Sequence, residues 1–291
     1  MNLLGLLGAS LKHSFSPVMM NRLARQGDLP FAYFPFEIPA EKLPHFVEAV
    51  RLLPISGFNV TIPHKVAILS FLDELTPEVQ AVGAVNTVLN RDGKLIGYNT
   101  DTAGFLGSVN RLFGKENPPR AALILGSGGA ARAVLYTLLK SGTKTVFLSN
   151  RREERARKLA EDFGRLFPEK EIVPGPLKAA FLKQALARAT LIVQTTSVGM
   201  WPHEEEELPF PFEALHPGHK VIDLIYNPEE TRFLRDVRKR GAEALNGLPM
   251  LIGQAAKSLE IWGFPGLEAN LLKIAGDLRE KTTPQTLEEK C

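Results

Sequence analysis

The sequence predicts an α/β protein made of two domains. Short β-rich runs alternate along the chain with longer helical patterns, which is typical of sheets covered by helices. A length of 291 residues suits two domains of ordinary size. The hydrophobic and charged fractions, 44% and 23%, are those of soluble globular proteins. No apolar run approaches the roughly 20 residues needed to cross a bilayer, so we expect no membrane partner.

Charge and cysteine content narrow the function classes. The net charge is +3, with 35 basic residues interleaved with 32 acidic ones, and this balance does not describe a nucleic-acid binder. The only cysteine is Cys291, so neither an intrachain disulfide nor a thiolate metal site is expected. The first ten residues lack a basic region and are interrupted by Gly5 and Gly8, which indicates a buried strand rather than a signal peptide. We therefore expect a cytoplasmic protein.

The first hundred residues alternate strands with helices and then form a hairpin. Two apolar strands joined at Asp92-Gly93 are predicted within 86–99, which makes the sheet mixed. A helix from about Thr102 to Phe113 follows, and the paired prolines of 115–120 indicate a connector. The other predicted elements of this half are strands at 3–7, 31–38 and 57–61, and helices at 16–26 and 40–52.

The second half begins a new strand–helix alternation. Gly142 is expected to end the first of its helices, and the Pro-rich, acidic segment 201–218 is expected to be a surface loop. The predicted strands are 121–126, 144–150, 190–196 and 220–225, and the predicted helices are 131–142, 152–167 and 229–240.

A glycine-rich turn lies between the first strand and first helix of this half. The residues are Gly126-Ser127-Gly128-Gly129-Ala130, in the strand–turn–helix context that a dinucleotide fingerprint requires. Glycines let the backbone approach a pyrophosphate, and the helix N-terminus supplies amide donors and a favourable dipole. A tight turn of purely structural origin is the alternative, and the combined context favours a cofactor.

The end of the next strand indicates which cofactor. An NAD site has an acidic residue there for the ribose 2′-hydroxyl, whereas NADP needs cationic donors for its 2′-phosphate. This strand ends at Asn150 and is followed by Arg151, Arg152 and Arg155, and guanidinium groups bind phosphate bidentately. An arginine-rich solvated helix face is the alternative interpretation. The position at the strand end favours NADP.

Polar residues also border three apolar strands of the first half. They occur in Asn59-Val-Thr-Ile-Pro-His-Lys65, in Gly83-Ala-Val-Asn-Thr87, and in Gly97-Tyr-Asn-Thr-Asp101. Sheet ends are where clefts form in α/β proteins, so these side chains are candidates for a binding site. Each could equally be a turn former or a helix cap, and Asp101 could be only the N-cap of the following helix.

Together, NVTIPHK, GAVNT and GYNTD, followed in order by GSGGAAR, NRREER, DLIYNP and GLPMLIGQ, resemble the shikimate dehydrogenase family. The resemblance runs from Ser14 to Gln254. It implies NADP-dependent, reversible reduction of 3-dehydroshikimate to shikimate. The fold that it implies is a mixed-sheet α/β substrate domain (1–102 and 247–291) and a Rossmann-type NADP-binding domain (103–246), with a cleft between them.

The resemblance also implies roles for single residues. Lys65 and Asp101 match the catalytic pair, in which a lysine supplies the proton that the alkoxide needs and a carboxylate keeps the ammonium charged. Both also match substrate contacts, together with Ser14 and Ser16 for the carboxylate, and Asn59, Thr61, Asn86, Tyr226 and Gln254. The matched NADP contacts are Gly126, Ser127, Gly128, Gly129, Ala130, Asn150, Arg151, Arg155, Leu224 and Gly247.

Alternatives remain open at this point. The nearest is a quinate or dual quinate/shikimate dehydrogenase, against which the serine pair and the arginines favour shikimate and NADP. A catalytically silent NADP-binding regulator is disfavoured because Lys65 and Asp101 are both present. His64 is interpreted as a packing or rim residue rather than a second base. No metal is expected, and the assembly is expected to be a monomer or homodimer.

Overall fold

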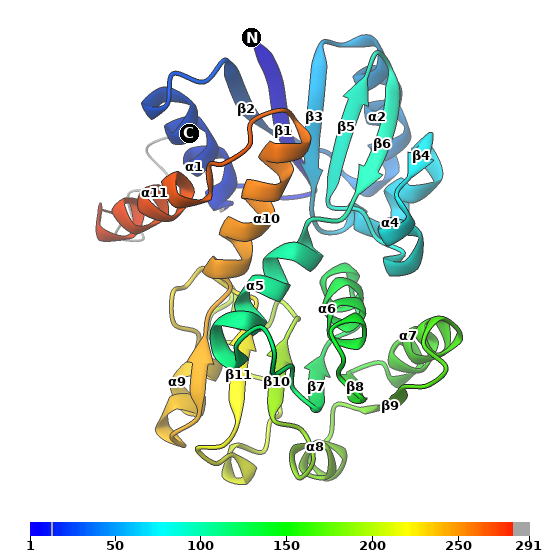
Figure 1. Ribbon diagram of the computed structural model, residues 1–291, viewed down its shortest axis with the longest axis vertical. Helices are drawn as coiled ribbons and strands as arrows, with labels where there is room; N and C mark the ends of the chain where they lie inside the picture. The colour runs from blue at the N-terminus through cyan, green and yellow to red at the C-terminus, as the bar shows by residue number, and fades with distance from the viewer. Residues whose placement is uncertain (13, 282–291) are drawn as a thin grey trace. The chain divides into compact units, whose positions relative to one another are not determined.

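The computed structural model describes residues 1–12 and 14–281, and within them the chain forms two compact units (Figure 1). The first unit contains Met1–Thr100 and the segment that starts at Ile252, and the second contains Asp101–Leu251. The units thus divide at 100/101 and 251/252, where the sequence places boundaries at 102/103 and 246/247. The expected α/β class is confirmed.

A mixed sheet forms the centre of the first unit. Within the described residues it has six strands in the order β2-β1-β3-β5-β6-β4, and β5 is antiparallel to both β3 and β6. The expected hairpin is present, because Arg91 pairs with Lys94 across the turn. The strands are β1 (Asn2–Gly8), β2 (Phe31–Glu37), β3 (Ile55–Val60), β4 (Glu74–Leu75), β5 (Thr87–Arg91) and β6 (Lys94–Tyr98).

The two faces of this sheet have different partners. Phe58 and Val88 belong to an apolar core that includes residues of the helix Leu43–Leu52. Side chains alternate along a strand, so Asn59 lies on the opposite face, where its amide contacts Ser258. The helices are α1 (Phe15–Gln26), α2 (Leu43–Leu52), α3 (His64–Ala67), α4 (Pro77–Val82), α10 (Leu248–Ile261, which begins in the second unit) and α11 (Glu268–Lys281), with 3-10 turns at Ala40–Lys42 and Ile68–Phe71.

The second unit is built on a parallel sheet. Its six described strands run in the order β12-β11-β10-β7-β8-β9, and every pairing is parallel. Counted from β7, this is the 3-2-1-4-5-6 order of the Rossmann fold, which reverses direction between β7 and β10. The strands are β7 (Ala121–Leu125), β8 (Thr145–Asn150), β9 (Glu171–Pro176), β10 (Leu191–Gln194), β11 (Lys220–Asp223) and β12 (Glu243–Leu245).

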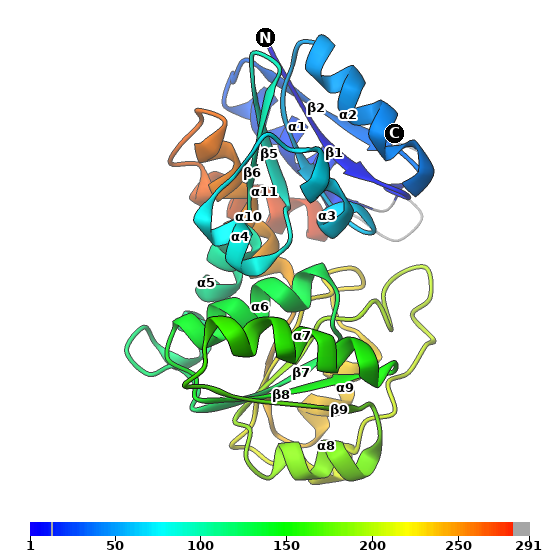
Figure 2. The same ribbon diagram turned by 90° about the vertical axis from the view of Figure 1, so that its right-hand side faces the viewer.

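Helices cover both faces of the parallel sheet. Figure 2 shows α6 and α7 on one face and α8 on the other. Buried residues of α8 and α9 belong to the same apolar core, so these two helices share a face. The helices are α5 (Asp101–Phe113), α6 (Gly129–Lys140), α7 (Glu153–Leu166), α8 (Ala179–Leu186) and α9 (Arg232–Lys239), with a 3-10 turn at Phe212–Ala214.

The sequence analysis does not predict β9 and α8. The strand β9 has the sequence EIVPGP, whose prolines and glycine argue against an interior strand. It lies at the edge of the sheet, where it pairs only with β8 among the described strands. An edge position tolerates proline because one side of the strand needs no ladder hydrogen bonds.

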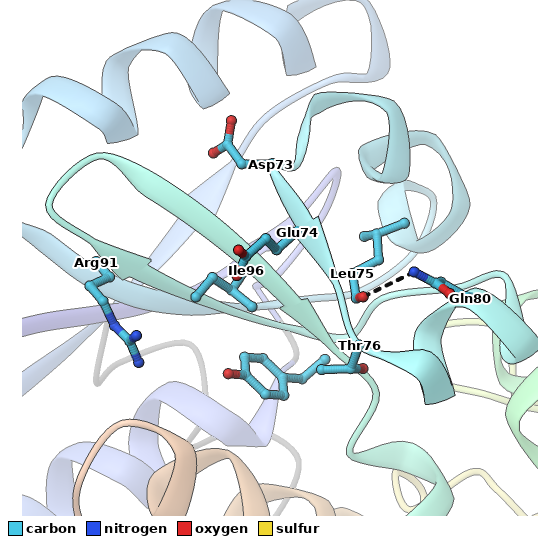
Figure 3. A pocket seen from close by; sticks show the side chains of 8 residues that line it. Asp73, Glu74, Leu75, Thr76, Gln80, Arg91 and Ile96 are labelled. Atoms are coloured by element: carbon cyan, nitrogen blue, oxygen red, sulfur yellow. Dashed lines mark hydrogen bonds between the residues drawn. The ribbon is translucent and has the colours of Figure 1, made fainter.

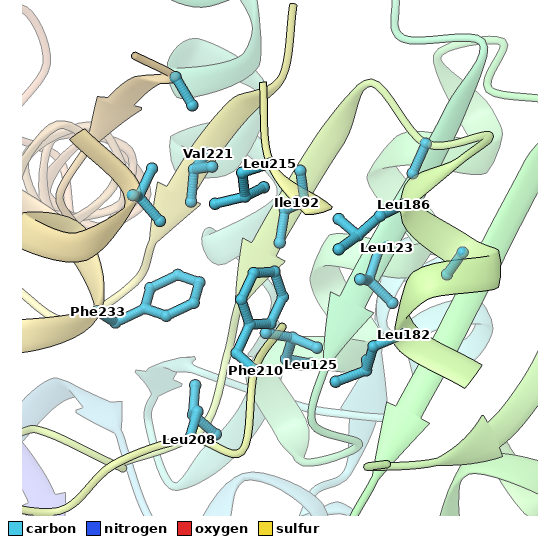
Figure 4. Close-up of a cluster of buried hydrophobic side chains, with 14 of the residues drawn as sticks. Leu123, Leu125, Leu182, Leu186, Ile192, Leu208, Phe210, Leu215, Val221 and Phe233 are labelled. Carbon is cyan, nitrogen blue, oxygen red and sulfur yellow. The ribbon is translucent and has the colours of Figure 1, made fainter. Parts of the chain in front are cut away.

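The expectation of a surface loop at 201–218 is wrong for its second half. Leu208, Phe210 and Leu215 are 7–8% exposed and belong to the apolar core beneath β10 and β11 (Figure 4). The ring of Phe210 meets that of Phe233 edge-on, with centroids 5.2 Å apart. The segment therefore has two parts. The acidic residues 204–207 form a polar first part, and the apolar side chains that follow them attach the loop to the core.

No described helix is long and apolar enough to cross a membrane.

The anchor can be tested by truncation. We expect Phe210→Ala to lower the free energy of unfolding by about 3–5 kcal/mol, because it leaves a cavity among well-packed side chains. Glu205→Ala on the same loop is the control, and an exposed site should change stability by less than about 0.5 kcal/mol. Urea unfolding monitored by circular dichroism measures both. Equal stability of the two variants would mean that the loop is not anchored.

Candidate active site

The pairing of three strands brings the polar motifs of the first unit to one edge. Asn59 at the end of β3 lies opposite Thr87 at the start of β5, and Thr87 lies opposite Tyr98 at the end of β6. The segments 59–65, 83–87 and 97–101, which are separate in the sequence, therefore converge. This edge carries the greatest concentration of the predicted substrate residues.

Main-chain hydrogen bonds place Lys65 at this edge. The Lys65 carbonyl accepts from the Val85 N–H at 2.8 Å, so α3 is attached to the second motif. Thr61 joins β1 by donating its N–H to the Leu7 carbonyl at 2.8 Å. His64 is fully buried, and its Nε2 lies 2.7 Å from the carbonyl oxygen of Ile38. Its burial and this contact are consistent with the packing role expected for His64.

A buried group of amides and hydroxyls lies beside the converging motifs. We call it the polar cluster, and its members are between 0% and 6% exposed. The amide Nδ2 of Asn59 lies 3.0 Å from Thr87 Oγ1, and Asn86 Nδ2 lies 2.9 Å from Thr100 Oγ1. The cluster consists of Asn59, Asn86, Thr87, Thr100 and Ser258.

The sequence analysis did not identify Ser258, because only its spacing from Gln254 points to it. It lies one helical turn after Gln254, on the same face of α10, so the spacing alone could have pointed to it. Tyr33 was also missed, and its hydroxyl donates to Asn59 Oδ1 at 2.8 Å. Nothing in the sequence around Tyr33 indicates a polar role, because β2 is an aromatic strand.

The two predicted carboxylate-binding serines lie at the beginning of α1. Ser14 is its N-cap, and Ser14 Oγ accepts from the Ser16 N–H at 3.4 Å. Ser14 is half-buried and Ser16 is buried. A helix of 12 residues has unpaired N–H groups and a positive dipole end here, so an anion is favoured near both hydroxyls.

The other predicted substrate residues lie in three different segments. Gln254 is half-buried on α10, where its Oε1 accepts from Asn86 Nδ2 at 3.4 Å. Asp101 is 5% exposed and is the first residue of α5, directly after Thr100 of the polar cluster. Tyr226 belongs to the second unit and is half-buried in the loop after β11.

The glycine turn of the second unit follows β7, at the point where the strand order of the sheet changes direction. Gly126 follows β7 with φ +112°, a conformation that side chains disfavour, and a Cβ there would lie 2.4 Å from Thr195 Oγ1. Around Gly128 a Cβ would meet nothing within 4 Å. The backbone before α6 is therefore bare, which fits a pyrophosphate at the helix N-terminus. Ser127, Gly129 and Ala130 are half-buried in the same turn.

The predicted ribose-phosphate residues follow β8. Asn150 ends the strand, and its side chain donates to the Arg152 carbonyl at 2.9 Å, which shapes the turn into α7. Arg151 and Arg155 are exposed, and neither forms an ion pair with a carboxylate among the described residues. Arg157 on the same helix pairs with Glu153. Two such guanidinium groups fit a phosphate.

The loop after β11 is held by a buried carboxylate. Asp223 is fully buried, and it accepts from the Thr231 hydroxyl at 2.6 Å and from the Ile225 N–H at 3.1 Å. Gly247 closes against this loop, since a Cβ there would lie 2.0 Å from the Leu224 carbonyl oxygen. Leu224 and Gly247, both predicted NADP contacts, are therefore adjacent. The role of Asp223 was not predicted.

A polar pocket of about 470 Å³ lies elsewhere in the first unit, along β4 and β6 (Figure 3). Gln80 Nε2 donates to the Leu75 carbonyl at 3.3 Å beside it. Its carboxylates already have cationic partners, since Asp73 pairs with Arg51 and Glu74 pairs with Lys94. The lining residues are Asp73, Glu74, Leu75, Thr76, Gln80, Arg91, Ile96 and Tyr98. Of the predicted site residues it contains none.

Burial raises the pKa of Asp223 to about 6, although the hydrogen bonds from Thr231 and Ile225 oppose the shift. The folded protein then holds a proton that the unfolded chain has lost above its ordinary pKa of 3.8. Protonated Asp223 therefore adds to the free energy of unfolding relative to ionised Asp223. This stabilisation is fully present below about pH 4 and is lost as the pH rises through about 6, a change of about 3 kcal/mol.

We expect Asp223→Asn to lack this contribution. Urea unfolding of both proteins between about pH 4.5 and 7.5 gives their free energies of unfolding. As the pH rises, the stability of the variant should increase relative to that of the wild type. Parallel stability curves would contradict the raised pKa.

Comparison with known proteins shows which family this chain resembles. Residues 6–88 match the family described as the shikimate dehydrogenase substrate binding domain, and residues 110–202 match shikimate / quinate 5-dehydrogenase. A shikimate dehydrogenase (NADP(+)) from Desulforamulus reducens is 41% identical over 259 residues, which are 89% of this chain and 88% of the relative.

Solved structures match over nearly the whole chain. A shikimate dehydrogenase in complex with NADP+ has a TM-score of 0.85 at 35% identity, covering 95% of this chain and 96% of its own. A quinate dehydrogenase from Corynebacterium glutamicum in complex with NAD has a TM-score of 0.83 at 27% identity, covering 95% and 99%. With relatives this similar over this much of its length, the chain belongs to the shikimate dehydrogenase family.

Proposed function

We propose that this chain catalyses the reversible, NADP-dependent reduction of 3-dehydroshikimate to shikimate. The observation that carries the proposal is the convergence of segments 59–65, 83–87 and 97–101 at one sheet edge, with Lys65 attached to the second segment. Relatives named for this reaction with NADP(+) support it. We further propose that the enzyme works in the cytoplasm as a monomer or homodimer.

The second unit would hold NADP. The turn from Gly126 to Ala130, with its open backbone at Gly128, suits the pyrophosphate, and Arg151 and Arg155 suit the 2′-phosphate. Leu224 and Gly247 would border the nicotinamide, and Asn150 the adenosine ribose. When bound, the reduced cofactor supplies the hydride for the ketone carbon of the substrate.

Lys65 and Asp101 are the residues that we assign to proton transfer. Reduction of a ketone leaves an alkoxide, and the Lys65 ammonium donates the proton that converts it to a hydroxyl. In the reverse direction the neutral amine accepts that proton. Asp101 is the acidic member of this proposed pair, and its carboxylate would attract the ammonium group and hold it in place.

Substrate recognition relies on neutral groups. Ser14 and Ser16 bind the substrate carboxylate at the N-terminus of α1, where the dipole adds to their hydrogen bonds. The ring hydroxyls are bound by amide and hydroxyl side chains, which can both donate and accept. These side chains are those of Asn59, Thr61, Asn86, Tyr226 and Gln254.

The function is tested by following the absorbance of NADPH. We expect the purified enzyme to reduce 3-dehydroshikimate with NADPH and to oxidise shikimate with NADP. Parallel assays with quinate and with NAD separate the alternatives. Faster oxidation of quinate than of shikimate would favour quinate dehydrogenase, and inactivity toward both would favour a regulator.

Replacing Lys65 should slow the chemical step. We expect Lys65→Ala to lower kcat by about 10²–10⁴-fold, the range for general acid–base groups, with a much smaller change in KM. Lys42→Ala, at an exposed lysine of the same unit, is the control. A normal kcat with a large rise in KM would mean that Lys65 only binds the substrate.

The arginines should select the cofactor. We expect replacement of Arg151 and Arg155 by Ala together to reduce kcat/KM for NADP. The corresponding loss of transition-state stabilisation should be roughly 1.5–3 kcal/mol at most for each charged hydrogen bond lost. The value for NAD should barely change, because its 2′-hydroxyl needs no cation. Arg157→Ala on the same helix is the control, since Arg157 already pairs with Glu153. Equal losses for both cofactors would contradict the assignment.

A further inference from the structure

Ser258 is the central member of the polar cluster. Its Oγ lies 2.9 Å from Asn59 Nδ2, 2.8 Å from Thr87 Oγ1 and 3.1 Å from Thr100 Oγ1, and it donates to the Gln254 carbonyl at 2.9 Å. The side chain is fully buried. Ser258 reaches the cluster from α10, whereas its other members lie between residues 59 and 100. It thus joins the cluster to the main chain of the helix that carries Gln254, and Asn86 contacts the Gln254 side chain.

The protein's own groups determine how the two cluster amides are oriented. The Thr100 N–H lies 2.6 Å from Asn86 Oδ1, so this atom must be the acceptor. Asn86 Nδ2 then donates to Thr100 Oγ1 at 2.9 Å and to Gln254 Oε1 at 3.4 Å. The Asn86 carbonyl accepts from Asn59 Nδ2 at 3.1 Å, and Tyr33 donates to Asn59 Oδ1. Each amide therefore has one allowed orientation.

The hydroxyl protons follow from these orientations. Ser258 has one proton, and the bond to the Gln254 carbonyl uses it. Toward the cluster Ser258 Oγ then accepts, from the Asn59 amide and from the hydroxyl of Thr87 or Thr100. The chain of donors thus passes through Ser258 and ends at the Gln254 carbonyl. Without this acceptor, buried donors compete for fewer partners, and an unsatisfied buried donor is costly.

We propose that Ser258 is a positioning residue of the reaction. It acts on Asn86 through the hydroxyls of Thr87 and Thr100, and on Gln254 through the main-chain carbonyl. In this way it keeps both side chains oriented toward the ring hydroxyls without itself touching the substrate. This inference rests on the proposed function, which assigns those two side chains to the substrate. Its consequence is that loss of the Ser258 hydroxyl weakens substrate binding while leaving the cofactor site of the second unit intact.

The test compares two buried serines that differ only in their surroundings. Ser258 and Ser108 are both fully buried in helices, and each donates to the carbonyl four residues earlier. We expect Ser258→Ala to raise KM for shikimate about tenfold, equivalent to one hydrogen bond, with kcat and the KM for NADP nearly unchanged. Ser108→Ala should change none of these constants.

A second variant keeps the test decisive if Ser258→Ala does not fold. Thr87→Val preserves shape but removes the hydroxyl that lies 2.8 Å from Ser258 Oγ, so it should raise KM for shikimate in the same way. When Ser258→Ala folds, the double variant should lose little more than either single variant, because one chain of hydrogen bonds is broken in each.

Four outcomes would overturn the inference. They are an unchanged KM for shikimate in Ser258→Ala, equal changes for shikimate and NADP, the same changes in Ser108→Ala, and, if Ser258→Ala does not fold, an unchanged KM in Thr87→Val. A wild-type enzyme that does not oxidise shikimate would instead contradict the proposed function.

Discussion

Main-chain hydrogen bonds between β5 and its two antiparallel neighbours hold the substrate side of this protein together. They bring Asn59, Thr87 and Tyr98 into register, and with them three polar segments that the chain visits in succession. Lys65 then needs only the bond between its carbonyl and the Val85 N–H to join this edge. A parallel arrangement would need a crossover and would place the start of β5 at the opposite edge.

The polar cluster behind this edge shows why such a site must be complete. Buried amides and hydroxyls strengthen one another when every donor has an acceptor, and they are destabilising when one does not. Here main-chain groups of Asn86 and Thr100 orient the two amides, so the backbone that builds the sheet also directs the side chains. In the proposed function, substrate recognition and folding thus depend on the same hydrogen bonds.

The second unit uses the opposite strategy. The strand order of its parallel sheet changes direction between β7 and β10. There the backbone is bare at Gly128, and Gly126 allows the chain to pass close to Thr195. In the proposed function, main-chain donors at a helix start serve a phosphate, and the exposed arginines after β8 add charge. The fully buried carboxylate of Asp223 shapes a loop.

The sequence by itself determined the α/β class, the mixed first sheet and the glycine-rich turn, and it made Lys65 and Asp101 candidates for a binding site. These depend on local patterns, namely apolar periodicity, glycine at a strand end and charged residues at element boundaries, each of which acts within a few residues. The resemblance to a family added the substrate and the residues that contact it.

Only the tertiary structure revealed the roles of Tyr33, Ser258 and Asp223, and the anchoring of Phe210. Each depends on partners distant in the sequence or on the packing of several elements, as when Ser258 meets Asn59 across 199 positions. A serine in a helix, a tyrosine in an aromatic strand or a phenylalanine in an acidic loop looks the same in sequence whether or not such a partner exists. Side-chain hydrogen bonds and core packing are decided by which elements meet, and this is settled when the chain folds.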